Sequence, residues 1–201
     1  VTGVQTCALP LLVLEENQAI LKDRAHLEEL YEIEAAGKIL TPRETAWLER
    51  LAERYGLERV NLVELRRRVD AVPPSLAIAQ AAVETGWGTS RLAQQGHALF
   101  GQRAANGEDH QTFGSPAEAV RAYIGNLNTH NAYREFRERR AARRAQELPL
   151  DGLQLATFLK RYSERGRDYV KDVRTVIRAN DLNTLDSARL ANQSAVSLRT
   201  S

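Results

Sequence analysis

Residues 81–101, which read AAVETGWGTSRLAQQGHALFG, contain one carboxylate at a position suited to chemistry. Glu84 follows an apolar run and comes just before Gly86, Trp87 and Gly88. At the end of a buried helix, the helix dipole and burial would both raise the pKa of this carboxyl. A carboxyl still protonated near neutral pH can act as a general acid, and Trp87 could stack on a sugar. The structural alternatives are an ion pair between Glu84 and an arginine, and a core role for Trp87.

The segment before Glu84 predicts a buried helix. Residues 73–86, PPSLAIAQAAVETG, start with proline and serine and end on glycine, as helices commonly do. Apolar side chains occupy nearly every face, and such a helix is normally surrounded by protein. Glu84 is therefore expected in the last turn of a central helix, with a short second helix over residues 89–95.

Helical patterns also dominate the rest of the chain. Thr41, Pro42 and Glu44 have the spacing of a capping box, and Ser115, Pro116 and Glu118 repeat it. Asn106–Gly107 is a turn signal within residues 101–114. The predicted fold class is all-α with at most a small β-hairpin. Further helices are expected over residues 12–36, 131–145, 152–162 and 168–179.

Composition narrows the possible functions. Of 201 residues, 43% are hydrophobic and 27% are charged, which is typical of globular proteins, and no apolar stretch approaches the length of a membrane span. The net charge of +2 argues against nucleic acid as a partner. One cysteine permits neither an internal disulfide nor a CxxC site. The histidines are scattered, so we expect no metal and no other cofactor.

The motif around Glu84 is similar to the catalytic motif of the bacterial glucosaminidase family, glycoside hydrolase family 73. The blocks SPAEAVRAYIGNLNTHNAYREFRERRA and LKRYSERGRDYVKDVRTVIRANDL resemble later parts of the Bax-like branch of this family. The resemblance runs from about residue 25 to residue 183. It implies a lysozyme-like helical fold with a groove for a glycan strand.

The resemblance also implies roles for individual residues. Glu84 becomes the catalytic acid, and Leu99, Phe100 and Gly101 match the family's NLFG element, with His97 and Ala98 in place of two asparagines. Tyr162 matches a cleft residue near the acid. Trp87, Phe100 and Tyr162 are the expected substrate-binding residues. Tyr123 and Tyr133 match aromatic positions where a core role is equally expected.

The second catalytic group is the open question. Glycosidases usually pair a proton donor with another carboxylate. The family is expected to carry it on a hairpin after Phe100–Gly101, where this chain offers Glu108 and Asp109 in a shortened stretch. Glu118 is an alternative by chemistry, although its capping position gives it a local role. In a third route the substrate's own N-acetyl oxygen serves instead.

The sequence therefore predicts a peptidoglycan hydrolase of the endo-β-N-acetylglucosaminidase type, located in the periplasm or cell envelope. The alternatives are a muramidase or lytic transglycosylase on the same scaffold, and a peptidoglycan-binding module without turnover. Six arginines between Arg134 and Arg144 predict a solvated helix face or, alternatively, weak contact with anionic polymers or membrane surfaces.

Four segments are expected along the chain. Residues 1–10, VTGVQTCALP, resemble the conceptual translation of a sequencing adapter and are interpreted as foreign to the protein. Residues 11–70 form a helical N-terminal segment, and residues 71–183 form the glucosaminidase-like domain. Residues 184–201 have little to bury and are predicted to be a flexible tail.

Overall fold

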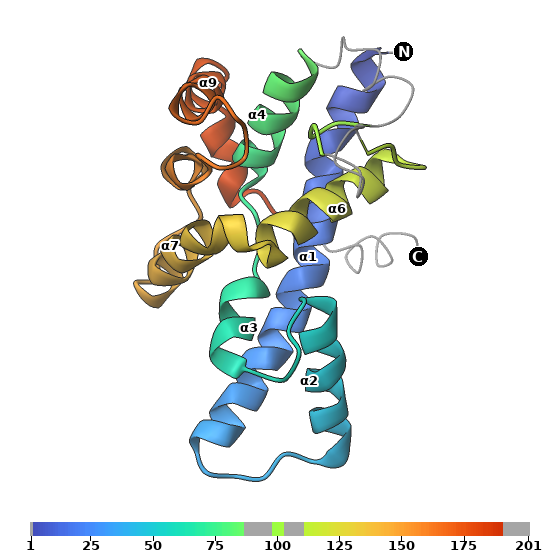
Figure 1. Cartoon of the computed structure of the whole chain (residues 1–201), viewed down its shortest axis with the longest axis vertical. Helices are drawn as coiled ribbons and strands as arrows, with labels where there is room; N and C mark the ends of the chain where they lie inside the picture. The colour runs from blue at the N-terminus through green and yellow to red at the C-terminus, as the bar shows by residue number, and fades with distance from the viewer. Residues whose placement is uncertain (1, 87–97, 103–110, 191–201) are drawn as a thin grey trace, which may run out of the picture.

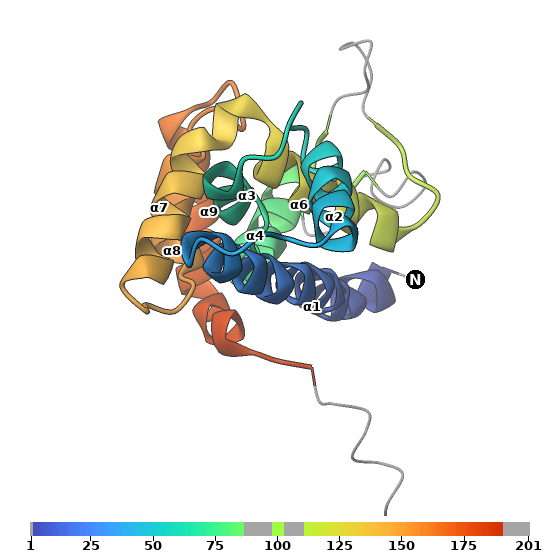
Figure 2. The ribbon, with the colours of Figure 1, turned by 90° about the horizontal axis from the view of Figure 1, so that it is seen from below.

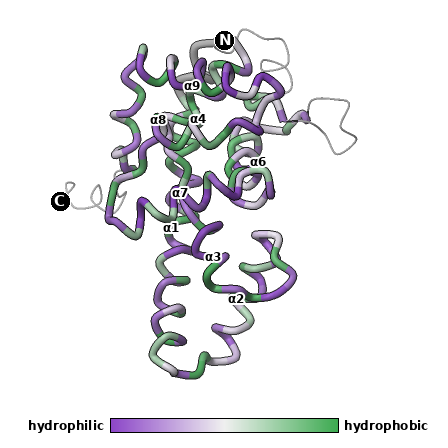
Figure 3. The backbone as a smooth tube through the Cα atoms, turned by 60° about the vertical axis from the view of Figure 1, so that its left-hand side comes forward, coloured by the Kyte–Doolittle hydropathy of each residue, from purple (hydrophilic) through white to green (hydrophobic). Residues whose placement is uncertain are grey.

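The computed structural model describes residues 2–86, 98–102 and 111–190. Its longest helix, α1 (Thr2–Ala35), extends along the whole molecule (Figure 1). The buried face of α1 carries Val13, Ile20, Leu27 and Leu30, at spacings that place them on one side of the helix. Hydrophilic and hydrophobic residues accordingly alternate along its turns (Figure 3).

Residues 2–10 continue α1, with Pro10 inside the helix and Leu9 buried in the core. The adapter interpretation of residues 1–10 concerns the source DNA, and it stays a prediction.

The helices α2 (Pro42–Arg54) and α3 (Leu62–Arg68) pack beside the far half of α1 (Figure 1). The predicted capping box is confirmed, because Thr41 Oγ1 accepts from the backbone N–H of Glu44 at 3.3 Å and the Thr41 N–H donates to Glu44 Oε2 at 2.6 Å. Arg54 pairs with Asp23 of α1 at 2.6 Å. The capping box sets where α2 begins, and the ion pair connects the end of α2 to α1.

The central helix is α4 (Pro74–Thr85), and it is buried on nearly every side, as its composition predicts. Helices α1, α8 and α9 and the 3₁₀ helix η3 all pack against it. Gly86 ends the helix in the left-handed conformation, with a φ of 55°. Glu84 therefore lies in the last turn of a helix whose position is set by core packing.

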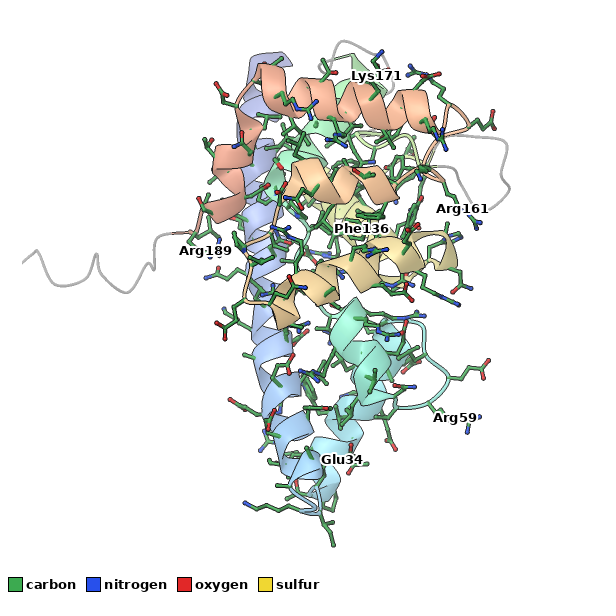
Figure 4. All side chains as sticks on the ribbon, turned by 90° about the vertical axis from the view of Figure 1, so that its left-hand side faces the viewer. Glu34, Arg59, Phe136, Arg161, Lys171 and Arg189 are labelled. Carbon is green, nitrogen blue, oxygen red and sulfur yellow. The ribbon has the colours of Figure 1, made fainter. Side chains whose placement is uncertain are left out.

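The second half of the chain surrounds α4. It contains α6 (Pro116–Thr129), η1 (Asn131–Tyr133), α7 (Arg134–Ala145), α8 (Gly152–Leu155), η2 (Ala156–Phe158), α9 (Arg167–Ala179) and η3 (Leu182–Ser187). Helices α7, α8 and α9 lie one above another beside α1 (Figure 4). The helix expected over residues 152–162 ends at Phe158, so Tyr162 lies in a turn.

The part of the chain that the structure describes is all-α and contains no strand. The predicted hairpin turn, like the helix predicted over residues 89–95, lies outside the described residues. The ends of the hairpin segment do meet, because the Gln111 N–H donates to the Gln102 carbonyl at 2.7 Å.

The first residues of the predicted tail are part of the folded structure. Residues 184–187 belong to η3, and they are held there by the buried Asp186 carboxylate. Asp186 accepts hydrogen bonds from Ser75 N–H at 2.9 Å, Ser75 Oγ at 2.8 Å and Gly152 N–H at 2.8 Å. No local pattern indicates this role, because the partners of Asp186 are distant in the chain.

The two segments predicted over residues 11–70 and 71–183 share one hydrophobic core. Seen from below, α1 runs along one side of the other helices (Figure 2). Asn17 of α1 makes two hydrogen bonds with the backbone of Val72, at 2.7 and 2.9 Å. The segment just before α4 is thus tied directly to α1.

Candidate active site

Glu84 lies at the open end of α4, half-buried, where the helix stops at Gly86. The Glu84 charge acts on the hydroxyls of Tyr133, Tyr162 and Tyr169, which come from three different elements. Three phenol groups from different elements therefore lie near the acid.

Among these tyrosines, Tyr169 of α9 has its hydroxyl within hydrogen-bonding reach of Glu84. Burial raises the pKa of Tyr169, and the negative charge of Glu84 raises it further. Burial also raises the pKa of Tyr162 and of Tyr133. All three phenols are consequently protonated near neutral pH, and each has a hydrogen to donate.

Gly101 packs against the Glu84 carboxyl. A Cβ atom added at Gly101 would lie 2.5 Å from Glu84 Oε2, and the glycine has a φ of +60°. The positive φ favours glycine at this position, and a Cβ there would push the Glu84 carboxyl aside. The Gly101 backbone therefore limits where the carboxyl group can turn.

A hollow of about 440 Å³ adjoins this arrangement. Its lining includes Gly101, Asn126, Tyr133 and Tyr162, so polar and aromatic groups face a common space. Sugar rings are bound by this combination of flat aromatic surface and hydrogen-bonding side chains. We call this space the cleft hollow.

Phe100 and Tyr162, both predicted as substrate-binding residues, are brought together near the cleft hollow. The Tyr162 hydroxyl donates to the Phe100 carbonyl at 2.8 Å. Phe100 is only 1% exposed, and its ring stacks on that of Tyr123 with ring centres 4.0 Å apart. It therefore supports the wall of the hollow from the core side. Tyr123 is a core residue, whereas Tyr133 lines the hollow.

Gln80 and Tyr169 are two residues near Glu84 that sequence reasoning missed. Gln80 is fully buried one turn before Glu84, and it bonds Tyr123 and Tyr169. A glutamine inside an otherwise apolar helix was the available signal, because a buried amide needs hydrogen-bond partners. The identity of those partners could not be predicted, since Tyr169 lies 89 residues away.

Several predicted site residues lie outside the described residues. These are Trp87, Glu108 and Asp109, together with His97 of the altered motif. Their roles stay predictions. Glu118, the chemical alternative, is exposed, and its Oε2 accepts from the Gly114 N–H at 3.0 Å while its own N–H donates to Ser115 Oγ. Its position fits the local capping role expected for it.

The arginine-rich helix α7 corrects the interpretation of its charges as a solvated face, while contact with anionic polymers stays a prediction. Arg137 and Arg140 are buried and donate to backbone carbonyls, Arg137 to Leu127 and His130 at 3.1 and 2.8 Å. Arg143 and Arg144 are also engaged, with Pro149 and with Asp70. Only Arg134 and Arg139 have no hydrogen bond or ion pair within the described part of the chain. Most of these arginines therefore stabilise the folded structure.

Two other kinds of site are absent from the residues that the structure describes. Among them, no group of three or more His, Cys, Asp or Glu side chains is arranged to hold a metal ion. No helix in these ranges has both the length and the apolar character needed to cross a bilayer.

The fold and this geometry define a class of protein. Its members are helical domains with a carboxyl group at the end of a buried helix, beside a hollow lined by aromatic residues. Residues 61–182 match the family model described as mannosyl-glycoprotein endo-beta-N-acetylglucosaminidase. The chain belongs to this Glucosaminidase family. The match places it among the glycoside hydrolases.

A curated relative supports the same assignment. The chain is 35% identical over 144 residues to Protein bax of Escherichia coli (strain K12), an alignment that covers 64% of this chain. The aligned region covers 53% of that relative, so this chain spans about half of its length. No solved structure matches the chain.

Proposed function

We propose that the protein is a peptidoglycan hydrolase, an endo-β-N-acetylglucosaminidase that cleaves the β-1,4 bond after N-acetylglucosamine. The main support is the Glu84 carboxyl, which lies against Gly101, a residue of the cleft hollow, and near the Tyr169 hydroxyl. Membership of the Glucosaminidase family supports a glycan as substrate. The protein would act in the periplasm or cell envelope, where this substrate lies.

In the proposed mechanism, Glu84 donates its proton to the glycosidic oxygen as the bond to the anomeric carbon breaks. Tyr133 and Tyr162 help to bind the sugar beside the bond. The positive charge that develops on the sugar is stabilised by Glu108 or Asp109, or by the substrate's own N-acetyl oxygen. Water then adds to the anomeric carbon, and its proton restores the acid.

Product analysis tests this function directly. Purified peptidoglycan is digested with the protein, and the new ends are reduced with borohydride and identified by mass spectrometry. We expect reduced N-acetylglucosamine at the new ends. Reduced N-acetylmuramic acid would instead indicate a muramidase, and anhydromuramic ends would indicate a lytic transglycosylase. Binding to peptidoglycan without any release of fragments would indicate a module without turnover.

A second contact with the cell wall is proposed at a basic hollow of about 860 Å³. Arg134, Arg139, Lys160 and Arg161 line it together with Glu135 and Glu138, and Arg139 lies over the Phe158 ring at 5.3 Å. Arg161 lies at the end of the α7–α9 stack away from α1 (Figure 4). The excess of positive charge would attract the carboxylates of peptidoglycan weakly.

Removing two of these charges should weaken binding to peptidoglycan. The variant Arg134→Gln/Arg139→Gln is expected to bind sedimented peptidoglycan several-fold less well at about 0.05 M salt, with little difference at about 0.3 M. The control Arg50→Gln/Arg59→Gln removes the same charge from exposed positions, and Arg59 lies in the α2–α3 half of the molecule (Figure 4). Equal losses in the two variants would show that only net charge matters.

A further inference from the structure

We propose that Gln80 is a positioning residue: it orients the Tyr169 hydroxyl so that its hydrogen is donated to the Glu84 carboxylate. The proposal rests on the proposed function to the extent that Glu84 is the proton donor. It adds a role for a buried amide that contacts no substrate. The support comes from four hydrogen-bonding groups that lie in series on three helices.

The series begins at Tyr123 on α6 and ends at Glu84 on α4. The Tyr123 hydroxyl donates to Gln80 Oε1 at 2.7 Å, and Gln80 Nε2 donates to the Tyr169 hydroxyl oxygen at 2.8 Å. The Tyr169 hydroxyl lies in turn within hydrogen-bonding reach of Glu84. Gln80 and Glu84 are four residues apart, so they lie on the same face of the helix.

The direction of these bonds follows from the number of hydrogens available. Each tyrosine hydroxyl has one hydrogen, and Tyr123 uses its hydrogen on Gln80 Oε1. The amide NH₂ group must then face Tyr169 and donate to its oxygen. The Tyr169 hydrogen is left for the carboxylate.

The opposite orientation of the amide would leave one group unsatisfied. Tyr169 would donate to Gln80, and the hydrogen of Tyr123 would have no acceptor among the described residues. Gln80 and Tyr123 are fully buried, where an unpaired donor is costly. The network therefore favours the orientation that directs the Tyr169 hydrogen to Glu84.

The two tyrosine rings are held in place by their neighbours. Tyr123 stacks on Phe100 with ring centres 4.0 Å apart, and Tyr169 stacks on Tyr162 with ring centres 5.5 Å apart. Because the rings cannot swing freely, their hydroxyls stay at fixed positions. The amide of Gln80 then needs only to select the direction of the hydrogen bonds.

This arrangement has a consequence for the charge of Glu84. The titratable groups that face it among the described residues are Tyr133, Tyr162 and Tyr169. A donated hydrogen bond stabilises a carboxylate, so its loss lets the group stay protonated to higher pH. For a general acid, this moves the alkaline limb of the pH–rate profile to higher pH.

Two substitutions test the role of Gln80. Gln80→Met removes the amide, and Tyr169→Phe removes the hydroxyl while keeping the ring. In each variant the ¹³C-carboxyl titration of Glu84, assigned by its absence in Glu84→Gln, is expected to move up by roughly half to one pH unit. The alkaline limb of kcat/KM should move by the same amount. The double variant should show no more than the larger single shift, because Gln80 acts through Tyr169.

A third variant, Tyr123→Phe, removes the hydroxyl that fixes the orientation of the Gln80 amide. It should move the Glu84 titration in the same direction as Gln80→Met, and by no more than that variant does. If Gln80→Met does not fold, the near-isosteric Gln80→Glu replaces it. Its carboxylate accepts from Tyr169, so the Glu84 titration should again move up.

The titration separates this proposal from the proposed function, because it requires no turnover. Unchanged Glu84 titration in Gln80→Met and Tyr169→Phe, or additive shifts in the double variant, would overturn the positioning role. The expected shifts in a protein that cleaves no glycan would support the network while contradicting the proposed function.

Discussion

Replacing Glu84 with glutamine is expected to lower kcat for glycan cleavage by about 10²–10⁴-fold, because glutamine keeps the size of the side chain but has no proton to donate. The amide oxygen can still accept from Tyr169, and the cleft hollow is unchanged, so KM should change little. The measurement is the release of soluble reducing ends from peptidoglycan. Activity above a tenth of the wild-type rate would place the proton donor elsewhere.

Two further variants test whether the cleavage rate depends on which carboxylate is removed and on where the Glu84 carboxyl lies. Glu118→Gln removes an exposed carboxylate on α6 and should leave activity close to the wild-type level. Gly101→Ala keeps Glu84 but places a Cβ against its Oε2, where the distance would be 2.5 Å. Displacing the carboxyl by about 1 Å should cost up to about 10²-fold in rate. A fully active Gly101→Ala protein would show that this contact does not position the acid.

The predictions that succeeded depended on local signals. The apolar faces of residues 74–85 predicted a surrounded helix, and Thr41 with Glu44 predicted the start of α2. Glu84 could be placed because it ends the first of these patterns. In each case the physical cause lies within one or two helical turns of the residue.

The features that were missed depend on contacts between distant segments. Arg137 and Arg140 look like exposed charges in sequence, but they donate to backbone carbonyls, which every residue type presents. Tyr169 could not be paired with Gln80 because helix packing, and not spacing along the chain, brings them together. Side chains that donate hydrogen bonds to an irregular segment of backbone leave no local pattern in the sequence.

Asp70 shows how strongly the fold depends on such contacts. Its carboxylate is 1% exposed and lies near three arginines: Arg144 donates from Nε at 2.6 Å, and Arg24 and Arg140 each approach to 3.7 Å. These side chains come from α1 and α7, and they hold the segment that leads into α4. Asp70 therefore links the N-terminal helix to the helix that carries Glu84.

Asp70→Asn is expected to lower the free energy of unfolding by about 3–5 kcal/mol, because it leaves buried guanidinium groups without their counter-charge. In a chain of this size, the melting temperature should fall by about 10 °C. The control is Asp172→Asn, which breaks an exposed pair with Arg165 and should cost at most about 1 kcal/mol. Equal losses in the two variants would contradict a special role for Asp70.

The pH dependence of stability provides a second measurement on Asp70. Burial alone would raise its pKa, but Arg140, Arg144 and Arg24 together outweigh burial and hold the pKa below its ordinary value. The stabilisation is therefore complete above the unfolded-state pKa, about 3.9, and is lost as the pH falls through the lower folded-state pKa. In urea unfolding below about pH 4, the difference between wild-type protein and Asp70→Asn should shrink. A difference that stays constant through this range would show that the Asp70 charge is not its source.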